Sequence, residues 1–393
     1  MSTEKACAIA IDIQHGSNFF TIPIELRRAV YAHLFDIPGQ HIRYVVDGGD
    51  GVQHFRLTPC IAPPVSDKRI RHGDERNPYP RSPDGFAPEG PLYFRRLLSS
   101  WGPHWMCEEL ACHFKEAGDL ESMFPPSHDF SSALRVCKRM YSDLVEIVTT
   151  STDFHVTDLQ TLEALLGQPE HTPAIHFSFE GSICPRITRL SITLSMSLAF
   201  FQEIEAASLA YGDQDGAASS AGPEEHNVMT WTCMTSRLLV QLPKLRKLRV
   251  WLDHNGIGFW SVVNERAILG PMEVLKKSNP GLELVCVLPK VHPKIEDRQR
   301  HYLPEDEEGE ASSSRLHIHR VLRQRYRVVT NGAGSKYVTY VKDFPHILGN
   351  PVFDNMSLAE KEKSEARFWR RGVDINQLST NHIGTIMYSP RTR

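Results

Sequence analysis

The amino-acid sequence predicts a mixed α and β fold, of the α+β or α/β class. Two amphipathic helical stretches occur before residue 150, and short apolar runs alternate with helical patterns after it. The chain has 393 residues, of which 41% are hydrophobic and 23% charged, so it can bury a core. We expect four segments: a helical region with an inserted hairpin and loop (1–150), an α/β region that is layered or loosely repetitive (151–303), an acidic linker (304–314), and C-terminal strands with a charged helix (315–393).

The first expected helix runs from Pro23 to Phe35. Leu26, Val30 and Leu34 recur at four-residue spacing and would form one apolar stripe along it. Thr21 is the expected N-cap, and a proline is tolerated in the first turn.

A long insertion, about residues 36–132, follows this helix. It opens with two alternating runs, His41–Val46 and Val52–Leu57, around a glycine-rich turn, which predicts a β-hairpin. Residues 59–91 are rich in Pro, Arg, Asp and Gly and are expected to form an irregular loop. A helical stretch is expected at residues 92–100.

A second amphipathic helix is expected at Ala133–Val148. Its apolar residues, which include Leu134, Cys137, Met140 and Leu144, lie three or four positions apart. This spacing predicts one continuous apolar face.

Strand-like and helical patterns alternate between residues 151 and 303. A strand–helix–strand order predicts parallel pairing through right-handed crossovers. Residues 190–194 and 245–250 also resemble turns of a leucine-rich-repeat-like array, so that architecture and a three-layer α/β sheet both remain open. The expected strands are residues 174–179, 190–194, 245–252 and 282–288, and the expected helices are residues 159–166, 198–211, 228–242 and 260–277.

Two polar segments interrupt the second half of the chain. Residues 212–225 are small and acidic, and we expect them to form a loop. Residues 304–314 are acidic and rich in serine, and we expect a disordered linker there.

The C-terminal part is expected to contain both strands and a helix. Residues 315–329 and 336–341 alternate like strands. Ser357 and Glu360 have the spacing of a capping box, which predicts a charged helix that runs to Gly372.

Net charge and the lack of targeting signals limit the partners and compartments expected for the protein. The formal net charge is -3, so no global field would attract nucleic acid or an acidic membrane. The N-terminus lacks the apolar core of a signal peptide, and no run of apolar residues is long enough to span a membrane. The eight cysteines are therefore expected to be free thiols in a protein of the cytoplasm or nucleus, which is not secreted.

Four segments resemble parts of one known family. Ile22–Leu26 (IPIEL) resembles the L-P-x-E-[IL] opening of an F-box, and Leu134–Tyr141 (LRVCKRMY) resembles a later F-box helix. Trp101–Glu109 (WGPHWMCEE) and Asp153–Val156 are similar to segments of the same group. In this order the segments resemble an uncharacterised fungal F-box-like family.

The resemblance implies a non-enzymatic protein-interaction module, used as a substrate receptor of a cullin ubiquitin ligase. In that role Ile22, Pro23, Leu26 and Val30 would contact a Skp-type adaptor, and the α/β region would hold an unknown protein client. Two alternatives remain open. The apolar stripe could instead pack in the core against the second helix, and the chain could be a standalone scaffold or regulator with no ubiquitin-ligase role.

Four residues have side chains that bind zinc: His104, Cys107, Cys112 and His113. However, structural zinc sites usually combine two close pairs of ligands, and on a helix the adjacent residues Cys112 and His113 would point apart. The alternative is a partly buried helix with thiols in its core. We therefore expect no metal and no cofactor.

Trp101, His104 and Trp105 are candidates for an aromatic interface. The alternative is that both indoles anchor the insertion to the rest of the chain, because tryptophan buries a large area.

Enzyme motifs are missing from the sequence. Asn331–Lys336 departs from a phosphate loop and is better interpreted as a hairpin turn, and no G-x-S-x-G, H-E-x-x-H or G-x-G-x-x-G occurs. The arginines between residues 315 and 327 are expected to lie on a solvated face, so we expect no enzyme activity and no nucleic-acid partner.

Overall fold

The fold was derived as a computed structural model. It describes separate stretches of the chain. The described residues are 17–34, 39–46, 53–62, 96, 98–112, 137–167, 184–210, 223–303, 316–323, 325–330, 332, 334, 336–341, 344–345 and 355–375.

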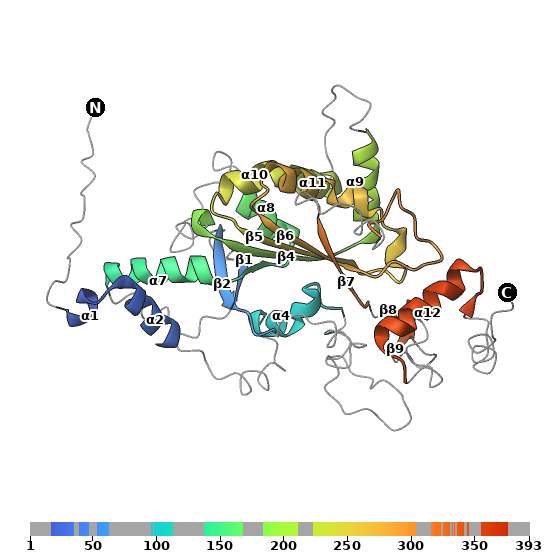
Figure 1. The fold of residues 1–393 in the computed structure, drawn as a ribbon, viewed down its shortest axis with the longest axis horizontal. Coiled ribbons are helices and arrows are strands. Elements are labelled where there is room, and N and C mark those ends of the chain that lie inside the picture. Colours follow the sequence, from blue (N-terminus) through green and yellow to red (C-terminus); the bar gives the residue numbers. More distant parts are fainter. Residues whose placement is uncertain are drawn as a thin grey trace. The chain divides into compact units, whose positions relative to one another are not determined.

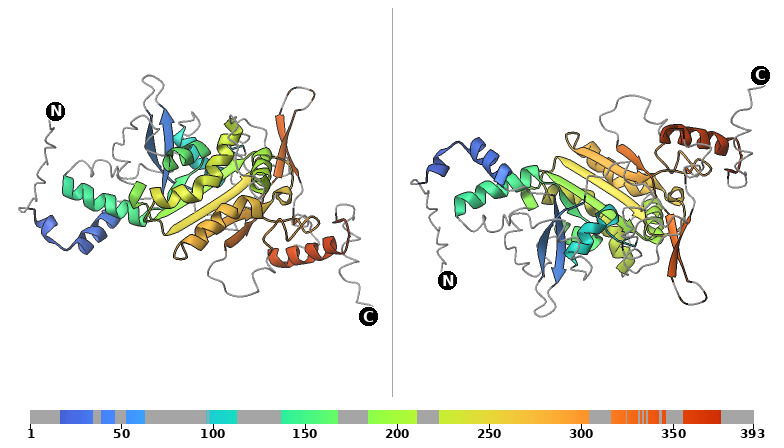
Figure 2. Two further views of the ribbon diagram at one scale, coloured as in Figure 1. Left: turned by 90° about the horizontal axis from the view of Figure 1, so that it is seen from above. Right: turned by 90° about the horizontal axis from the view of Figure 1, so that it is seen from below.

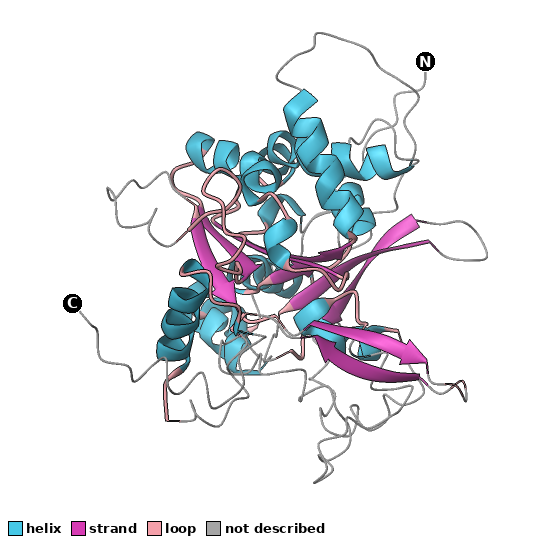
Figure 3. Ribbon diagram, turned by 90° about the vertical axis from the view of Figure 1, so that its right-hand side faces the viewer, coloured by secondary structure: helices cyan, strands magenta, loops and turns pink. Residues whose placement is uncertain are grey.

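Seven of the described strands form one mixed sheet in the order β2-β1-β3-β4-β5-β6-β7, and β8 pairs with β9 in a second sheet. Figure 1 labels most of these strands, and Figure 3 shows the strands in magenta. The strands are β1 (Gln40–Val46), β2 (Gln53–Pro59), β3 (Phe154–Val156), β4 (Arg189–Met196), β5 (Lys247–His254), β6 (Glu283–Pro289), β7 (His317–Val321), β8 (Arg325–Thr330) and β9 (Lys336–Val341).

None of the described helices is long and apolar enough to cross a membrane. The α-helices are α1 (Asn18–Thr21), α2 (Ile24–Leu34), α4 (Trp105–Ala111), α7 (Lys138–Ser151), α8 (Leu159–Leu166), α9 (Leu198–Ala210), α10 (Pro223–Gln241), α11 (Glu265–Ser278) and α12 (Leu358–Arg370). The short 3₁₀ helices are η2 (Gly102–His104), η5 (Cys184–Arg186) and η6 (Trp260–Val262).

The described residues fall into two compact units. Unit 1 takes those within 1–62, 106–192 and 237–248, and unit 2 takes those within 63–105, 193–236 and 249–393. The division between Trp105 and Met106 falls inside α4, so η2 and α4 form one continuous helical segment across it.

Unit 1 begins with the helices α1 and α2 and continues into the hairpin of β1 and β2. The hairpin is antiparallel, with Gln40 opposite Pro59 and Val46 opposite Gln53, as the sequence predicted (Figure 2). β1 and β4 both run parallel to β3. β3, α8 and β4 have a strand–helix–strand order, and the pairing of β3 with β4 is parallel, as expected for that order. α8 begins after Asp158, whose carboxylate accepts hydrogen bonds from the backbone N–H and the hydroxyl of Thr161.

Unit 2 contains most of the remaining helices and the parallel pair of β6 and β7. α11 buries one face, formed by Ile268, Leu269, Met272 and Leu275, and Asn264 caps its first turn. α12 starts at the predicted capping box, in which the Ser357 hydroxyl and the Glu360 carboxylate each accept from the other's backbone N–H. β8 and β9 form the hairpin that was predicted around residues 331–336.

Four helix boundaries differ from the predictions. α10 begins at Pro223, inside the loop predicted at 212–225, whereas its start was expected at residue 228. α7 begins at Lys138 with the Cys137 side chain as its cap, whereas residues 133–136 lie outside the described part. Thr21 closes α1, where its hydroxyl donates to the Asn18 carbonyl, so it does not cap α2. The helix expected from residue 260 is divided, because η6 is followed by an extended residue, Val263, before α11 begins.

Several predicted segments lie outside the described residues. They are most of the loop at 59–91, most of the stretch at 92–100, the strand at 174–179, most of the loop at 212–225, and the acidic linker at 304–314.

Candidate functional site

The helices α2 and α7 pack side by side in unit 1 (Figure 1). Their shared core consists of Tyr31, Leu144 and Ile147, and the half-buried Phe19 and Met140 pack against it. Tyr31 and Leu144 are fully buried. This apolar cluster holds one face of α2 against α7.

A buried ion pair fixes the same face. Arg27 Nε donates to Asp143 Oδ2 over 2.8 Å, and the two side chains are 6% and 10% exposed. Arg27 Nη1 also donates to the carbonyl of Ile22 over 2.8 Å. The N–H donors of a guanidinium have a fixed planar arrangement, so they reach these acceptors in only one orientation of the side chain. These contacts therefore fix the rotation of α2 about its own axis.

The apolar stripe of α2 faces away from α7. Leu26, Val30 and Leu34 are 56%, 37% and 53% exposed. The alternative that this stripe packs in the core is therefore wrong. Arg27 and Tyr31 form a second row at the same four-residue spacing, and that row carries both the buried ring and the ion pair.

The other two residues of the predicted adaptor surface lie just before α2. Pro23 is exposed and Ile22 is half-buried. Together with Leu26, Val30 and Leu34 they form what we call the α2 surface, a row of apolar side chains along the start and one side of the helix.

The predicted aromatic interface is buried instead. Trp101 and Trp105 are each 5% exposed and His104 is 6% exposed. The guanidinium of Arg96 lies over the Trp105 ring, 4.7 Å from its centroid. These residues are placed as anchors of the insertion, so a partner could not reach them without unfolding this segment.

Glycine is required at the turn that leads to His104. Gly102 has a φ of 53°, and a Cβ there would lie 2.8 Å from a ring carbon of Trp251. The backbone can therefore approach the indole only without a side chain.

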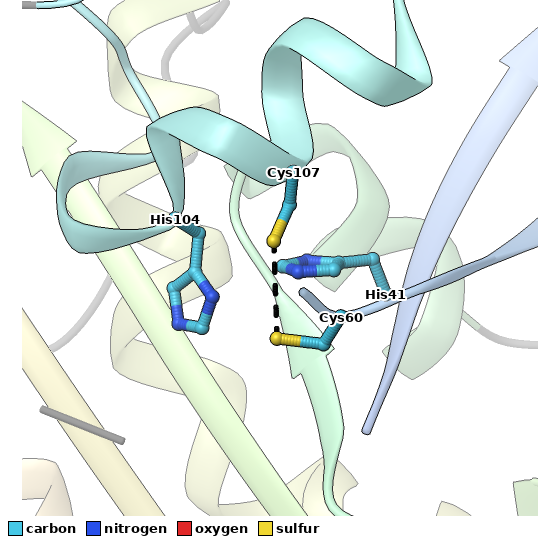
Figure 4. A group of neighbouring side chains, drawn as sticks. All are labelled: His41, Cys60, His104 and Cys107. Carbon is cyan, nitrogen blue, oxygen red and sulfur yellow. Dashed lines mark hydrogen bonds between the residues drawn. The ribbon is translucent and has the colours of Figure 1, made fainter. Parts of the chain in front are cut away.

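The structure gives His104 and Cys107 different neighbours from those considered in the sequence. Cys112 is exposed, and His113 lies outside the described residues. His104 and Cys107 instead meet His41 and Cys60, and one ligand atom of each lies within 4.8 Å of the others (Figure 4). We call these four residues the His–Cys cluster.

The hairpin explains how His41 and Cys60 come together. His41 pairs with Thr58, and Cys60 follows two residues later, where its N–H donates to the carbonyl of Gly39 over 2.6 Å. Residues two apart on a strand point to the same face, so His41 and Cys60 project from one side of the hairpin's end. The hairpin was predicted from local sequence, whereas its approach to the H-x2-C segment of His104 and Cys107 has no local signal in the sequence.

Close contacts surround the sulfur atoms of the cluster. Cys107 Sγ donates to Cys60 Sγ over 3.9 Å, and the backbone N–H of Ile61 donates to Cys107 Sγ over 3.3 Å. The neighbouring Cys60 thiol and burial both raise the pKa of Cys107. A Cβ at Gly39 would lie 3.2 Å from Cys60 Cβ and 2.7 Å from His155 Nε2, so this corner has no room for a side chain.

A second buried polar group, in unit 2, was missed in the sequence. Glu265 is fully buried and its carboxylate accepts from Trp260 Nε1 over 2.7 Å, from the Tyr302 N–H over 3.0 Å, and from the Arg320 guanidinium. Arg323 likewise pairs with Asp253 and donates to the carbonyls of neighbouring residues. The expectation of a solvated arginine face is therefore wrong for Arg320 and Arg323.

Comparison with known proteins gives a family but no function. No curated protein and no solved structure matches the chain. A family described as a domain of unknown function, DUF7730, matches residues 12–302, which include both the α2–α7 pair and the His–Cys cluster. Because this match covers most of the sequence, the chain belongs to the DUF7730 family.

Proposed function

We propose that this protein is a non-enzymatic interaction module whose α2 surface binds a Skp-type adaptor, as an F-box-like substrate receptor of a cullin ubiquitin ligase does. The proposal combines the resemblance of Ile22–Leu26 and of the α7 region to F-box segments with the exposure of the α2 surface.

One observation carries the proposal. Leu26 and Leu34 are eight residues apart, which is about 12 Å along the helix, and Val30 lies midway between them. All three side chains are exposed. The opposite side of α2 is held by the buried Arg27–Asp143 pair, so the apolar residues cannot turn inward without breaking it. Apolar residues aligned on one exposed helix face are typical of a surface that a partner covers.

The α/β part would hold the protein client in this proposal. The leucines of β4 and β5 resemble those of leucine-rich-repeat-like strands, and repeat arrays of that kind present extended binding surfaces.

A standalone scaffold or regulator is the second candidate. It is favoured by the position of the hairpin between α2 and α7, because β1 of that hairpin pairs with β3 of the main sheet. The helix pair thus belongs to the same unit as β1, β2 and β3.

Co-purification of the tagged full-length chain with a Skp-type adaptor tests the proposal. The variant Leu26→Asp/Val30→Asp places two charges on the α2 surface without touching the buried face. The matched control, Leu209→Asp/Val240→Asp, changes two residues that are 71% and 74% exposed on other helices. We expect the wild type and the control to recover the adaptor and the α2 variant to lose it.

Two outcomes would overturn the adaptor proposal. Recovery of the adaptor by the α2 variant would show that binding does not use this surface. No recovery with any form of the protein, when circular dichroism shows all three folded, would favour the standalone scaffold.

A further inference from the structure

The His–Cys cluster has the donor chemistry of a structural zinc site. Two thiols and two imidazoles are a standard tetrahedral ligand set for Zn²⁺. His41, His104 and Cys107 are 0%, 6% and 2% exposed, and Cys60 is half-buried.

The distances in the cluster are close to those that zinc requires. Two thiolates about 2.3 Å from a tetrahedral ion lie roughly 3.8 Å apart, and Cys60 Sγ and Cys107 Sγ are 3.9 Å apart. All four ligand atoms lie within 4.8 Å of one another. Ligands on zinc lie roughly 3.3–3.8 Å apart, so binding needs no pair of ligand atoms to close by more than about 1.5 Å.

The ligands come in two close pairs on different elements. His41 and Cys60 project from one end of the β1–β2 hairpin, and His104 and Cys107 lie one helical turn apart on the continuous segment of η2 and α4. His41, Cys60 and Cys107 all belong to unit 1. This pairing meets the requirement that the set His104, Cys107, Cys112 and His113 did not meet.

The surroundings also suit a metal-bound thiolate. The N–H of Ile61 points at Cys107 Sγ, and a donor of this kind stabilises negative charge on sulfur. The ring of His155 lies 5.1 Å from that of His41, centroid to centroid, and limits how the His41 ring can turn.

We propose that His41, Cys60, His104 and Cys107 bind one Zn²⁺ ion that joins the β1–β2 hairpin to the helical segment of η2 and α4. Both thiols would lose their protons to solvent, and two thiolates with two neutral imidazoles would leave the site with no net charge. Four protein ligands fill a tetrahedral ion, so the site is closed and its role is structural.

A disulfide between Cys60 and Cys107 is the competing chemistry. The sulfur atoms would have to approach from 3.9 Å to about 2.05 Å, and the bond would not use the two histidines. The two chemistries differ in metal content and in mass, so one preparation distinguishes them.

The test is the zinc content of the full-length chain, purified without a histidine tag and in the presence of a non-chelating reductant. We expect about one zinc per chain by mass spectrometry of the metal. We expect Cys107→Ser to lose the metal. Cys112→Ser is the matched control, because this exposed thiol lies five residues away, and it should retain the full zinc content.

Replacement of zinc by Co²⁺ in the wild type gives a second readout that does not depend on any variant's folding. We expect visible d–d bands of a tetrahedral site and a thiolate-to-cobalt charge-transfer band. Absence of both zinc and these cobalt bands would overturn the proposal. So would retention of zinc by a folded Cys107→Ser variant, or a Cys60–Cys107 disulfide in protein that was alkylated at lysis.

Discussion

The His–Cys cluster and the Glu265 network both consist of polar groups at buried positions, but the two clusters differ in their chemistry. Glu265 is an anion whose two oxygens meet the Arg320 cation, an indole N–H and a backbone N–H. The His–Cys cluster brings together two thiols and two imidazoles, whose S and N atoms are ligands for a metal ion.

The difference shows how each cluster can reach electrical balance. The Glu265 network is balanced by residues that the chain itself supplies, so it is a structural device that is complete when the chain folds. In the zinc proposal, a dication replaces the two thiol protons of the His–Cys cluster. The stability of the Glu265 network should therefore change with mutation and not with zinc. The stability of the His–Cys cluster should rise when zinc binds.

The largest effect is expected from Glu265→Ala. This change leaves Arg320, whose side chain is 17% exposed, without its carboxylate. Removing one partner of a buried ion pair costs about 3–5 kcal/mol of unfolding free energy. Urea denaturation followed by circular dichroism measures this loss, and zinc content should stay unchanged.

The control for this variant is Glu296→Ala. Glu296 pairs with Arg370 on the surface, where the side chains are 23% and 51% exposed. A surface pair contributes about 0–1 kcal/mol. Equal losses in the two variants would mean that the Glu265 network is not the internally balanced cluster described above.

The Arg27–Asp143 pair is expected to give the next largest effect. As in the Glu265 network, the chain itself supplies both charges. However, the Asp143 carboxylate has fewer hydrogen-bond partners than the Glu265 carboxylate. Arg27→Met alone should cost about 3 kcal/mol, because it leaves a buried carboxylate unmatched. A double-mutant cycle with Asp143→Leu should show favourable coupling, and additive losses would argue against an interaction between the two side chains.

Zinc should stabilise one cluster and leave the other unchanged. At a free zinc concentration about 100 times the dissociation constant, stabilisation is about 2.7 kcal/mol. Hydrogen exchange with and without zinc should therefore differ at the β1–β2 hairpin and α4, and should be the same at α11 and β7. A uniform change along the chain, or a change at α11 alone, would contradict the assignment of the metal to the His–Cys cluster.

The regular elements could be predicted because their signals are local. The helix at α8 and the strands β4, β5 and β6 follow from apolar periodicity and short turns within a few residues. The position of the α2 stripe could not be predicted in the same way. Two rows on α2 have helical spacing, and only the distant Asp143 decides that the Arg27 row is the buried one.

The two polar clusters show the same limit. The spacing of His104 and Cys107 is visible in the sequence, but their partners are 63 and 47 residues away from them, at His41 and Cys60. Arg320 lies in a basic tract whose composition indicates a solvated face, yet it is partly buried because it pairs with Glu265, 55 residues earlier. Long-range pairing of this kind depends on the tertiary fold and has no local pattern.

The smallest effect is expected from Tyr31, a buried polar group that is neutral near pH 7. Burial, with a contribution from the negative charge of Asp143, raises the pKa of Tyr31 to about 12. In the unfolded chain the pKa is about 10, so the folded state holds the phenol proton more tightly. The stabilisation is fully present below pH 10 and is lost as the pH rises through 12.

Tyr31→Phe should isolate this contribution. At pH 11 the wild type should have lost about 1.4 kcal/mol more unfolding free energy, relative to its value at pH 8, than the variant has lost. Groups that titrate in both proteins cancel in the difference, including Tyr302, whose pKa is raised by burial and by Glu273. Identical alkaline profiles would show that the Tyr31 phenol ionises as readily in the fold as in the unfolded chain. Such a result would mean that the α2–α7 core is open to water, and that the polar groups it buries contribute less than those around Glu265.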